Sequence, residues 1–138
     1  MNSSQLVLNP LLAHVDERGT LIAIEGGIDL PFNIARVYYL VGSSGAARGF
    51  HAHRALDQLM VCAAGSVRVI VDDGRRRQEV VLDRPDVGLH VGKMKWREMH
   101  DFSPDCVLLV LASAHHDEKD YIRDYRQFLA TFESGTQT

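Results

Sequence analysis

The chain has 138 residues, of which 46% are hydrophobic and 24% charged, and its net charge is −3. A chain of this size and composition folds as one globular domain with its own core. The lack of a basic stripe excludes a dedicated nucleic-acid-binding surface, and the longest apolar run, residues 106–112, is far too short to span a bilayer.

Two further features predict a cytoplasmic protein. The first 15 residues lack a charged segment followed by a long apolar run, so we expect no secretion signal. Cys62 and Cys106 both lie inside apolar runs. This placement is typical of reduced core residues in a reducing compartment.

The first half of the chain predicts short strands separated by turns. A polar turn at residues 16–19 precedes a strand at residues 20–25, which the glycine pair at 26 and 27 ends. Residues 34–41 are rich in β-branched and aromatic side chains and therefore predict a second strand.

The second half continues this pattern. Strands are expected at residues 58–63, 66–72, 78–82, 88–91, 96–101 and 107–112. Asp73-Gly74 is a strong hairpin signal between two of them. Many short strands with turns between them favour an antiparallel β-barrel or jelly roll.

The pattern changes near the C-terminus, where helical spacing replaces alternation. Large apolar side chains recur at residues 121, 122, 125, 128, 129 and 132, which predicts a helix at about 117–132. Asp117 or Asp120 would be its N-cap. We therefore expect one all-β domain spanning residues 1–138, with a C-terminal α-helix.

The chemistry-bearing part of the sequence is a histidine pair, His51 and His53, in an expected strand. Residues two apart in a strand point to the same face, while Phe50 and Ala52 occupy the opposite face. Arg48 lies at the edge of this strand. The same spacing also suits a solvated strand face, but apolar flanks favour a lined cavity.

This stretch resembles the first motif of the cupins, in which two histidines are followed by a polar residue and a glycine, here Gln58 and Gly65. In metal-binding cupins the polar residue is Glu and a second motif supplies another His. That second position falls here near Trp96-Arg97. A neutral amide is a poor ligand and a guanidinium repels a cation, so we expect no metal.

A more specific resemblance covers residues 19–128 in collinear order. The segments that carry it are 34–39 (Ile-Ala-Arg-Val-Tyr-Tyr), 48–53 (Arg-Gly-Phe-His-Ala-His), 87–89, 96–99, 105–113 and 117–123. Together they are similar to the nucleotide-sugar 3,4-ketoisomerases, which act on dTDP-4-keto-6-deoxyglucose. The resemblance implies a jelly-roll cupin, a homodimer, no cofactor and a place in deoxysugar biosynthesis, such as that of lipopolysaccharide sugars.

The implied reaction moves a ketone from C4 to C3 of the sugar through an enediolate. Histidine suits the proton transfer, because its ordinary pKa lies near neutrality. The resemblance implies that His51 is the base and that His53 acts at the enediolate oxygens. It also favours Tyr39 over Tyr38 as the cavity phenol, although either could be structural.

The resemblance also implies a set of substrate-binding residues. Arg48 would bind the pyrophosphate, because a guanidinium can bind phosphate oxygens in a bidentate manner. A surface ion pair is the alternative for Arg48. Arg18, Arg97 and Glu98 would be wall residues of the site, although Glu98 could be a plain exposed carboxylate.

Three alternative functions stay open at this point. A 3,5-epimerase would use the same substrate and a histidine base but leave the ketone at C4. A non-catalytic sugar-binding cupin would bind without exchanging hydrogen. A metal-dependent cupin oxygenase would need ligands that the motif lacks.

Overall fold

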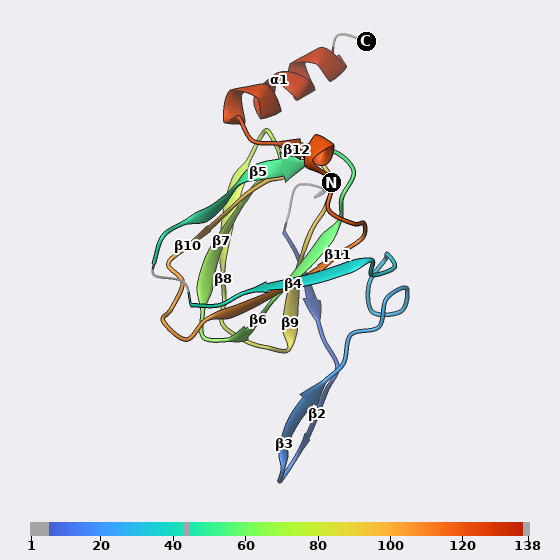
Figure 1. The fold of residues 1–138 in the computed structure, drawn as a ribbon, viewed down its shortest axis with the longest axis vertical. Coiled ribbons are helices and arrows are strands. Elements are labelled where there is room, and N and C mark those ends of the chain that lie inside the picture. Colours follow the sequence, from blue (N-terminus) through green and yellow to red (C-terminus); the bar gives the residue numbers. More distant parts are fainter. Residues whose placement is uncertain (1–5, 43–44, 137–138) are drawn as a thin grey trace.

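The computed structural model describes residues 6–42 and 45–136, so the other residues of the expected domain, at 1–5, 43–44 and 137–138, lie outside it. Two five-stranded sheets face each other (Figure 1). The first sheet has the order β1 (Val7–Pro10), β9 (Val87–Val91), β6 (Gln58–Ala64), β11 (Val107–Ala112) and β4 (Arg36–Leu40). The second has the order β12 (Tyr121–Ile122), β5 (Arg48–His53), β10 (Trp96–His100), β7 (Val67–Asp72) and β8 (Arg77–Leu82).

Neighbouring strands pair in antiparallel fashion in both sheets. The expected all-β jelly roll with a C-terminal helix is therefore confirmed. Alternating side chains of the two sheets meet in a core that includes Met60, Val69, Leu89 and Val110. Strand alternation places these residues inward, and their burial supplies the main stabilisation of the sandwich.

The strand β6 is apolar along most of its length because both of its faces are covered. Met60 and Cys62 face the core between the sheets. Leu59 and Val61 face outward and pack against a second cluster, to which Leu30 of the segment before β4 belongs. Cys62 and Cys106 are buried free thiols whose Sγ atoms lie 3.8 Å apart, as expected for core residues.

The C-terminal helix begins later than predicted. Helix α1 spans Tyr125–Thr136, and the predicted N-terminal part instead forms a 3₁₀ turn, η1 (Glu118–Asp120), followed by β12. Asp117 caps η1 by accepting the Lys119 N–H. Asp124 accepts the Gln127 N–H at 3.0 Å and is the N-cap of α1. Among the described residues, no helix is long and apolar enough to cross a membrane.

A two-stranded hairpin, β2 (Ala13–Asp16) and β3 (Gly19–Ile22), projects from the body of the molecule (Figure 1). The predicted turn at residues 16–19 is confirmed as the tip of this hairpin, although β3 ends at Ile22 rather than at residue 25. Val15 and Leu21 are 75% and 61% exposed. The hairpin therefore carries apolar side chains that this chain alone does not cover.

Candidate active site

The two histidines lie on the inner face of β5, one beside the other. Their ring centroids are 4.9 Å apart with the planes nearly perpendicular. The ring of Tyr121, on the neighbouring β12, lies 5.0 Å from His51 and 4.4 Å from His53. Ala52, between the histidines, is buried in the opposite cluster beneath α1, so the predicted alternation of this strand is correct.

A backbone irregularity precedes the pair. The register between β5 and β10 shifts between Arg97 and Glu98, and Gly49 has a φ of +95°. A Cβ at Gly49 would lie 3.0 Å from the Arg97 carbonyl oxygen. Glycine is required here, because it tolerates both the positive φ and the close approach of β10. This approach brings Arg97 directly opposite His51.

Both histidines are neutral at physiological pH. Burial, followed by the positive charge of Arg97, lowers the pKa of His51 to about 4 and that of His53 to about 2. The His51 Nδ1 lies 3.1 Å from the Gly49 carbonyl oxygen. A carbonyl can only accept, so Nδ1 of the neutral ring carries the proton and Nε2 is a free base.

The floor of the site is a polar chain built on a buried arginine. Arg97 is completely buried and donates to the Gln58 Oε1 and, at 3.0 Å, to the Lys95 carbonyl. Gln58 donates in turn to the Tyr38 hydroxyl at 3.1 Å. Burial lowers the pKa of Arg97 to about 10 and raises that of Tyr38. At neutral pH the chain therefore presents a cation and a protonated phenol.

This chain of contacts explains the altered cupin motif. The side-chain oxygen of Gln58 accepts a hydrogen bond from the Arg97 guanidinium. In a metal-binding cupin, the side-chain oxygen at this position would instead bind the metal ion. Within the described part of the chain, no three His, Cys, Asp or Glu side chains converge as a metal site would require. The donor set next to the histidines thus fits an anion better than a divalent cation.

The choice between the adjacent tyrosines requires a correction. Tyr39 is 64% exposed and points outward from β4, whereas Tyr38 packs against the core and reaches Gln58. Consecutive strand residues face opposite ways, so Tyr38 is the one of the two that faces inward and joins the chain of Gln58 and Arg97. Tyr39 does not line the site in this chain.

Three of the predicted substrate-binding residues also lie elsewhere. Arg18 is at the tip of the projecting hairpin, paired with Asp16 at 2.5 Å, and Arg48 is exposed at the start of β5. Glu98 faces the opposite side of β10 from Arg97. There it accepts from Trp96 Nε1 at 2.9 Å and lies beside Arg77. Of the predicted wall residues, only Arg97 lies with the histidines.

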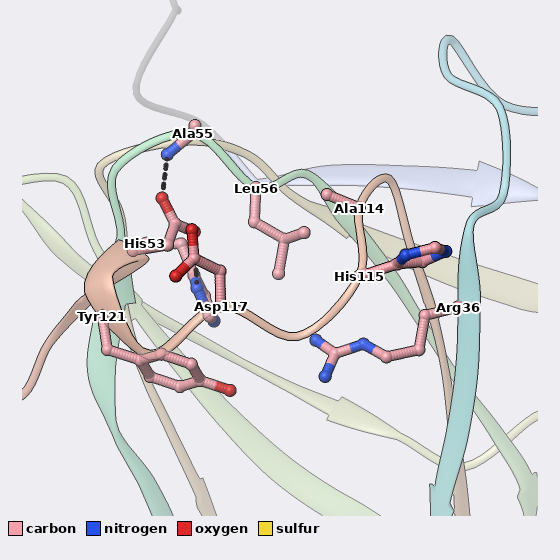
Figure 2. A pocket seen from close by; sticks show the side chains of 9 residues that line it. Arg36, His53, Ala55, Leu56, Ala114, His115, Asp117 and Tyr121 are labelled. Atoms are coloured by element: carbon pink, nitrogen blue, oxygen red, sulfur yellow. Dashed lines mark hydrogen bonds and ion pairs between the residues drawn. The ribbon is translucent and has the colours of Figure 1, made fainter.

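A cavity of about 100 Å³ opens beside His53. Figure 2 shows Arg36 of β4 and Tyr121 of β12 on opposite sides of it. The Arg36 Nε and the His53 Nε2 are buried and have no hydrogen-bond partner among the described residues. The cavity therefore offers unsatisfied polar groups to a ligand.

Sequence reasoning missed Asp120 and Tyr121 as site residues. Tyr121 fits the helical spacing of the later apolar residues and Asp120 fits the N-cap of that helix, which concealed the short strand β12 that pairs Tyr121 with His53. The signal that could have identified them is the turn-forming Asp-Glu-Lys-Asp run immediately before Tyr121. The sequence likewise predicts Arg36 only as part of the strand at residues 34–41.

The chain is similar to a known protein family and to a curated protein with a named activity. A family model described as "FdtA: WxcM-like, C-terminal" matches residues 4–133. A TDP-4-oxo-6-deoxy-alpha-D-glucose-3,4-oxoisomerase from Aneurinibacillus thermoaerophilus is 56% identical over 115 residues, 83% of each chain.

Solved structures give the same picture. A 3,4-ketoisomerase from Helicobacter canadensis is 41% identical with a TM-score of 0.90, over 93% of this chain and 97% of that chain. QdtA, a sugar 3,4-ketoisomerase from Thermoanaerobacterium thermosaccharolyticum solved with TDP, is 40% identical with a TM-score of 0.91, over 97% and 98%. The rmlC epimerase of Mycobacterium tuberculosis, 20% identical with a TM-score of 0.73 over 88% and 69%, shares the fold alone.

Proposed function

Because the chain belongs to the FdtA family of WxcM-like, C-terminal domains, we propose that it is a sugar-nucleotide 3,4-ketoisomerase. Its substrate is TDP-4-keto-6-deoxyglucose and its product the corresponding 3-keto-6-deoxyhexose, formed in deoxysugar biosynthesis. The observation that carries this proposal is the pair of neutral histidines that lie side by side on β5, next to a buried arginine. The curated relative that is 56% identical is named for this activity.

The isomerisation starts with removal of the proton on C3, which the C4 ketone acidifies. His51 is the base, because its Nε2 bears a lone pair while Nδ1 faces the Gly49 carbonyl. Removing the proton gives an enediolate spread over O3 and O4. Positioned acid–base catalysis of this kind accelerates proton transfer by about 10²–10⁴-fold.

The second half of the reaction delivers a proton to C4. The proton on O3 must leave and O4 must lose its negative charge, so that the ketone forms at C3. Arg97 and the Tyr38 hydroxyl, joined through Gln58, are donors for the oxygens of the enediolate. Pre-oriented donors in a buried site stabilise such a charge strongly, and the net change is an isomerisation without a redox partner.

The test of this function is the position of the ketone in the product. TDP-4-keto-6-deoxyglucose labelled with ¹³C at C3 and C4 is incubated with the protein and followed by NMR. We expect the carbonyl signal to move from C4 to C3. A carbonyl that stays at C4 while ring hydrogens exchange would indicate an epimerase, and an unchanged spectrum would indicate binding alone.

Metal independence is part of the proposal and is tested with the same assay. The support is the Arg97 guanidinium, which Gln58 holds next to the histidines, where a metal-binding cupin would hold its metal ion. After prolonged chelation and buffer exchange, we expect the rate of ketone migration to stay within about twofold of the untreated enzyme. Loss of activity that added zinc, iron or manganese restores would reassign the histidines as ligands.

We also propose that the protein is a cytoplasmic homodimer. Isolated two-stranded hairpins are marginally stable, yet β2 and β3 project from the body with Val15 and Leu21 exposed. A second copy would cover these side chains. The free thiols of Cys62 and Cys106 suit a reducing compartment. Sedimentation equilibrium at micromolar concentration should give twice the chain mass, and a monomer would contradict the dimer.

A further inference from the structure

We propose that Asp120 is a positioning residue that fixes the tautomer of His53, so that this ring presents a bare Nε2 to the sugar. The catalytic consequence rests on the proposed ketoisomerase function, whereas the tautomer itself can be observed without substrate. No role was expected for Asp120 beyond capping a helix. The structure instead places it at the site.

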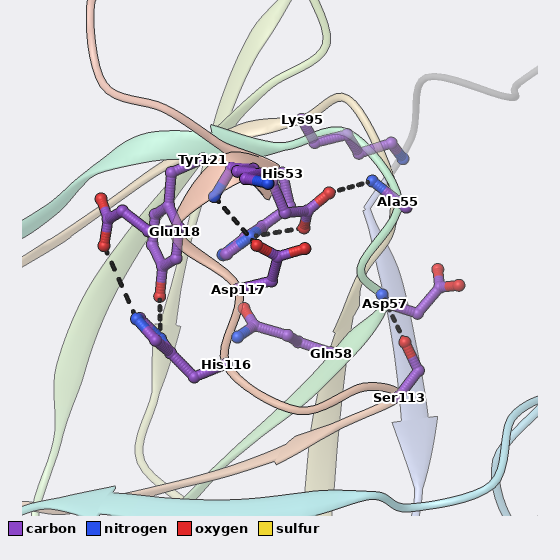
Figure 3. Close-up of polar contacts among 12 residues, drawn as sticks. His53, Ala55, Asp57, Gln58, Lys95, Ser113, His116, Asp117, Glu118 and Tyr121 are labelled. Atoms are coloured by element: carbon purple, nitrogen blue, oxygen red, sulfur yellow. Dashed lines mark hydrogen bonds and ion pairs between the residues drawn. The ribbon is translucent and has the colours of Figure 1, made fainter.

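The direct contact joins the Asp120 Oδ2 to the His53 Nδ1 at 3.0 Å. Figure 3 shows His53 beside the ring of Tyr121, the residue that follows Asp120. An ionised carboxylate can only accept hydrogen bonds, so the Nδ1 of the neutral ring carries the hydrogen. The second nitrogen, Nε2, is then unprotonated. It is buried and has no partner among the described residues, and His53 lines the cavity.

Asp120 itself is held from several sides. Its other carboxylate oxygen, Oδ1, accepts the Ala55 N–H at 2.7 Å. Its carbonyl accepts the Arg54 N–H and its own N–H donates to the Asp117 carbonyl, both at 3.0 Å. The next residue, Tyr121, pairs with His53 across β12 and β5. The carboxylate is therefore fixed relative to the strand that carries the histidine.

Two neutral histidines with bare Nε2 atoms suit the two proton transfers of a ketone shift. Carbon C3 and oxygen O3 each lose a proton, and C4 and O4 each gain one. His51 takes the proton from C3 and delivers a proton to C4, so that its ring also returns to the neutral form. His53 takes the proton from O3 and becomes an imidazolium, which the Asp120 carboxylate stabilises. It then returns the proton to O4, which restores the neutral ring.

The substitution Asp120→Asn tests the tautomer with an isosteric side chain. The Ala55 N–H can only donate, so it will keep the amide oxygen, and the amide NH₂ will face the His53 Nδ1. That nitrogen must then accept, which moves the ring hydrogen to Nε2. We expect ¹⁵N NMR to show His53 protonated at Nε2 in this variant and at Nδ1 in the unmodified protein, with the His51 signals unchanged.

The kinetic expectation follows because a protonated His53 Nε2 no longer has a lone pair that could accept the proton from O3. Asp120→Asn should lower kcat by about 10²–10⁴-fold while KM stays within about threefold, because the residue touches His53 rather than substrate. Asp124→Asn is the matched control, since Asn is also a good helix N-cap and this residue caps α1. It should leave both constants unchanged.

A double substitution separates positioning from a structural role. If Asp120 acts only through His53, adding Asp120→Asn to His53→Gln should cause no further loss of kcat. A further loss of more than about threefold in that background would overturn the proposal. So would an unchanged tautomer, or a kcat above a tenth of normal in Asp120→Asn alone. Failure of the unmodified protein to move the ketone would instead refute the ketoisomerase function and leave the NMR result standing.

Discussion

Arg97 determines the character of the site at the scale of single residues. It is completely buried, and its charge contributes to the low pKa of both histidines after the larger effect of burial. The same charge can stabilise an enediolate oxygen. One side chain therefore adds to the effect of burial in keeping the bases neutral and provides a positive group for the intermediate.

The tyrosine correction gives a prediction at this scale. Tyr38→Phe removes a hydroxyl that Gln58 holds in the site, so we expect kcat to fall about 10²-fold, as for loss of one oxyanion donor. Tyr39→Phe is the matched control on the outer face and should change kcat by less than about twofold. Steady-state kinetics checks both, and an equal loss in the two variants would contradict the assignment.

The sequence could not decide between these tyrosines for a physical reason. Tyr39 and Val37 on the outer face of β4 are as apolar as Tyr38 and Leu40 on its inner face, because the outer face is exposed yet not polar. When both faces of a strand are equally apolar, the sequence shows that side chains alternate between the faces but not which set points into the core. The histidine strand had a contrast between its faces, and its orientation was predicted correctly.

At the scale of elements, the C-terminal segment shows how two periodicities can overlap. Ile122 is buried because β12 pairs with β5, whereas Phe128 is buried because α1 packs on the outer face of β10. Both residues fit one helical spacing, so the predicted helix extended too far toward the N-terminus. Strand β7 was predictable because its core-facing valines alternate with less buried residues, whereas β6 and β11 were predictable as short continuous apolar runs.

The packing of α1 can be tested by truncating Phe128, the side chain of this helix that is most buried. Phe128 is completely buried and contacts the rings of Trp96, Tyr125 and Phe132. Phe128→Ala should lower the free energy of unfolding by about 3–5 kcal/mol, the usual cost of such a cavity. Gln127→Ala, on the exposed side of the helix, should change it by less than about 0.5 kcal/mol. Urea denaturation measures both, and equal effects would contradict the packing described.

At the scale of the whole molecule, the neutral histidines make folding sensitive to acid. Their ordinary pKa is 6.5, but in the folded protein it is lowered to about 4 for His51 and about 2 for His53. Between pH 6.5 and 4 the unfolded chain therefore binds more protons than the folded one. Stability is full above pH 6.5 and falls as the pH decreases through this window.

This dependence has a definite expected size. Each histidine should lower the free energy of unfolding with a slope approaching about 1.4 kcal/mol per pH unit. Urea denaturation between pH 7 and 5 measures the slope. Replacing both His51 and His53 by Asn should remove most of it. A slope that persists in the double variant would assign the acid sensitivity to other groups.

The most direct test of the account is the fate of the hydrogen on C3 of TDP-4-keto-6-deoxyglucose in deuterated water. Proton NMR follows the loss of the C3–H signal in the unmodified enzyme and in His51→Asn. We expect His51→Asn to slow this loss at least about 100-fold, while TDP binding stays within about threefold. Loss of the C3–H signal at more than a tenth of the normal rate would contradict the assignment of His51 as the base.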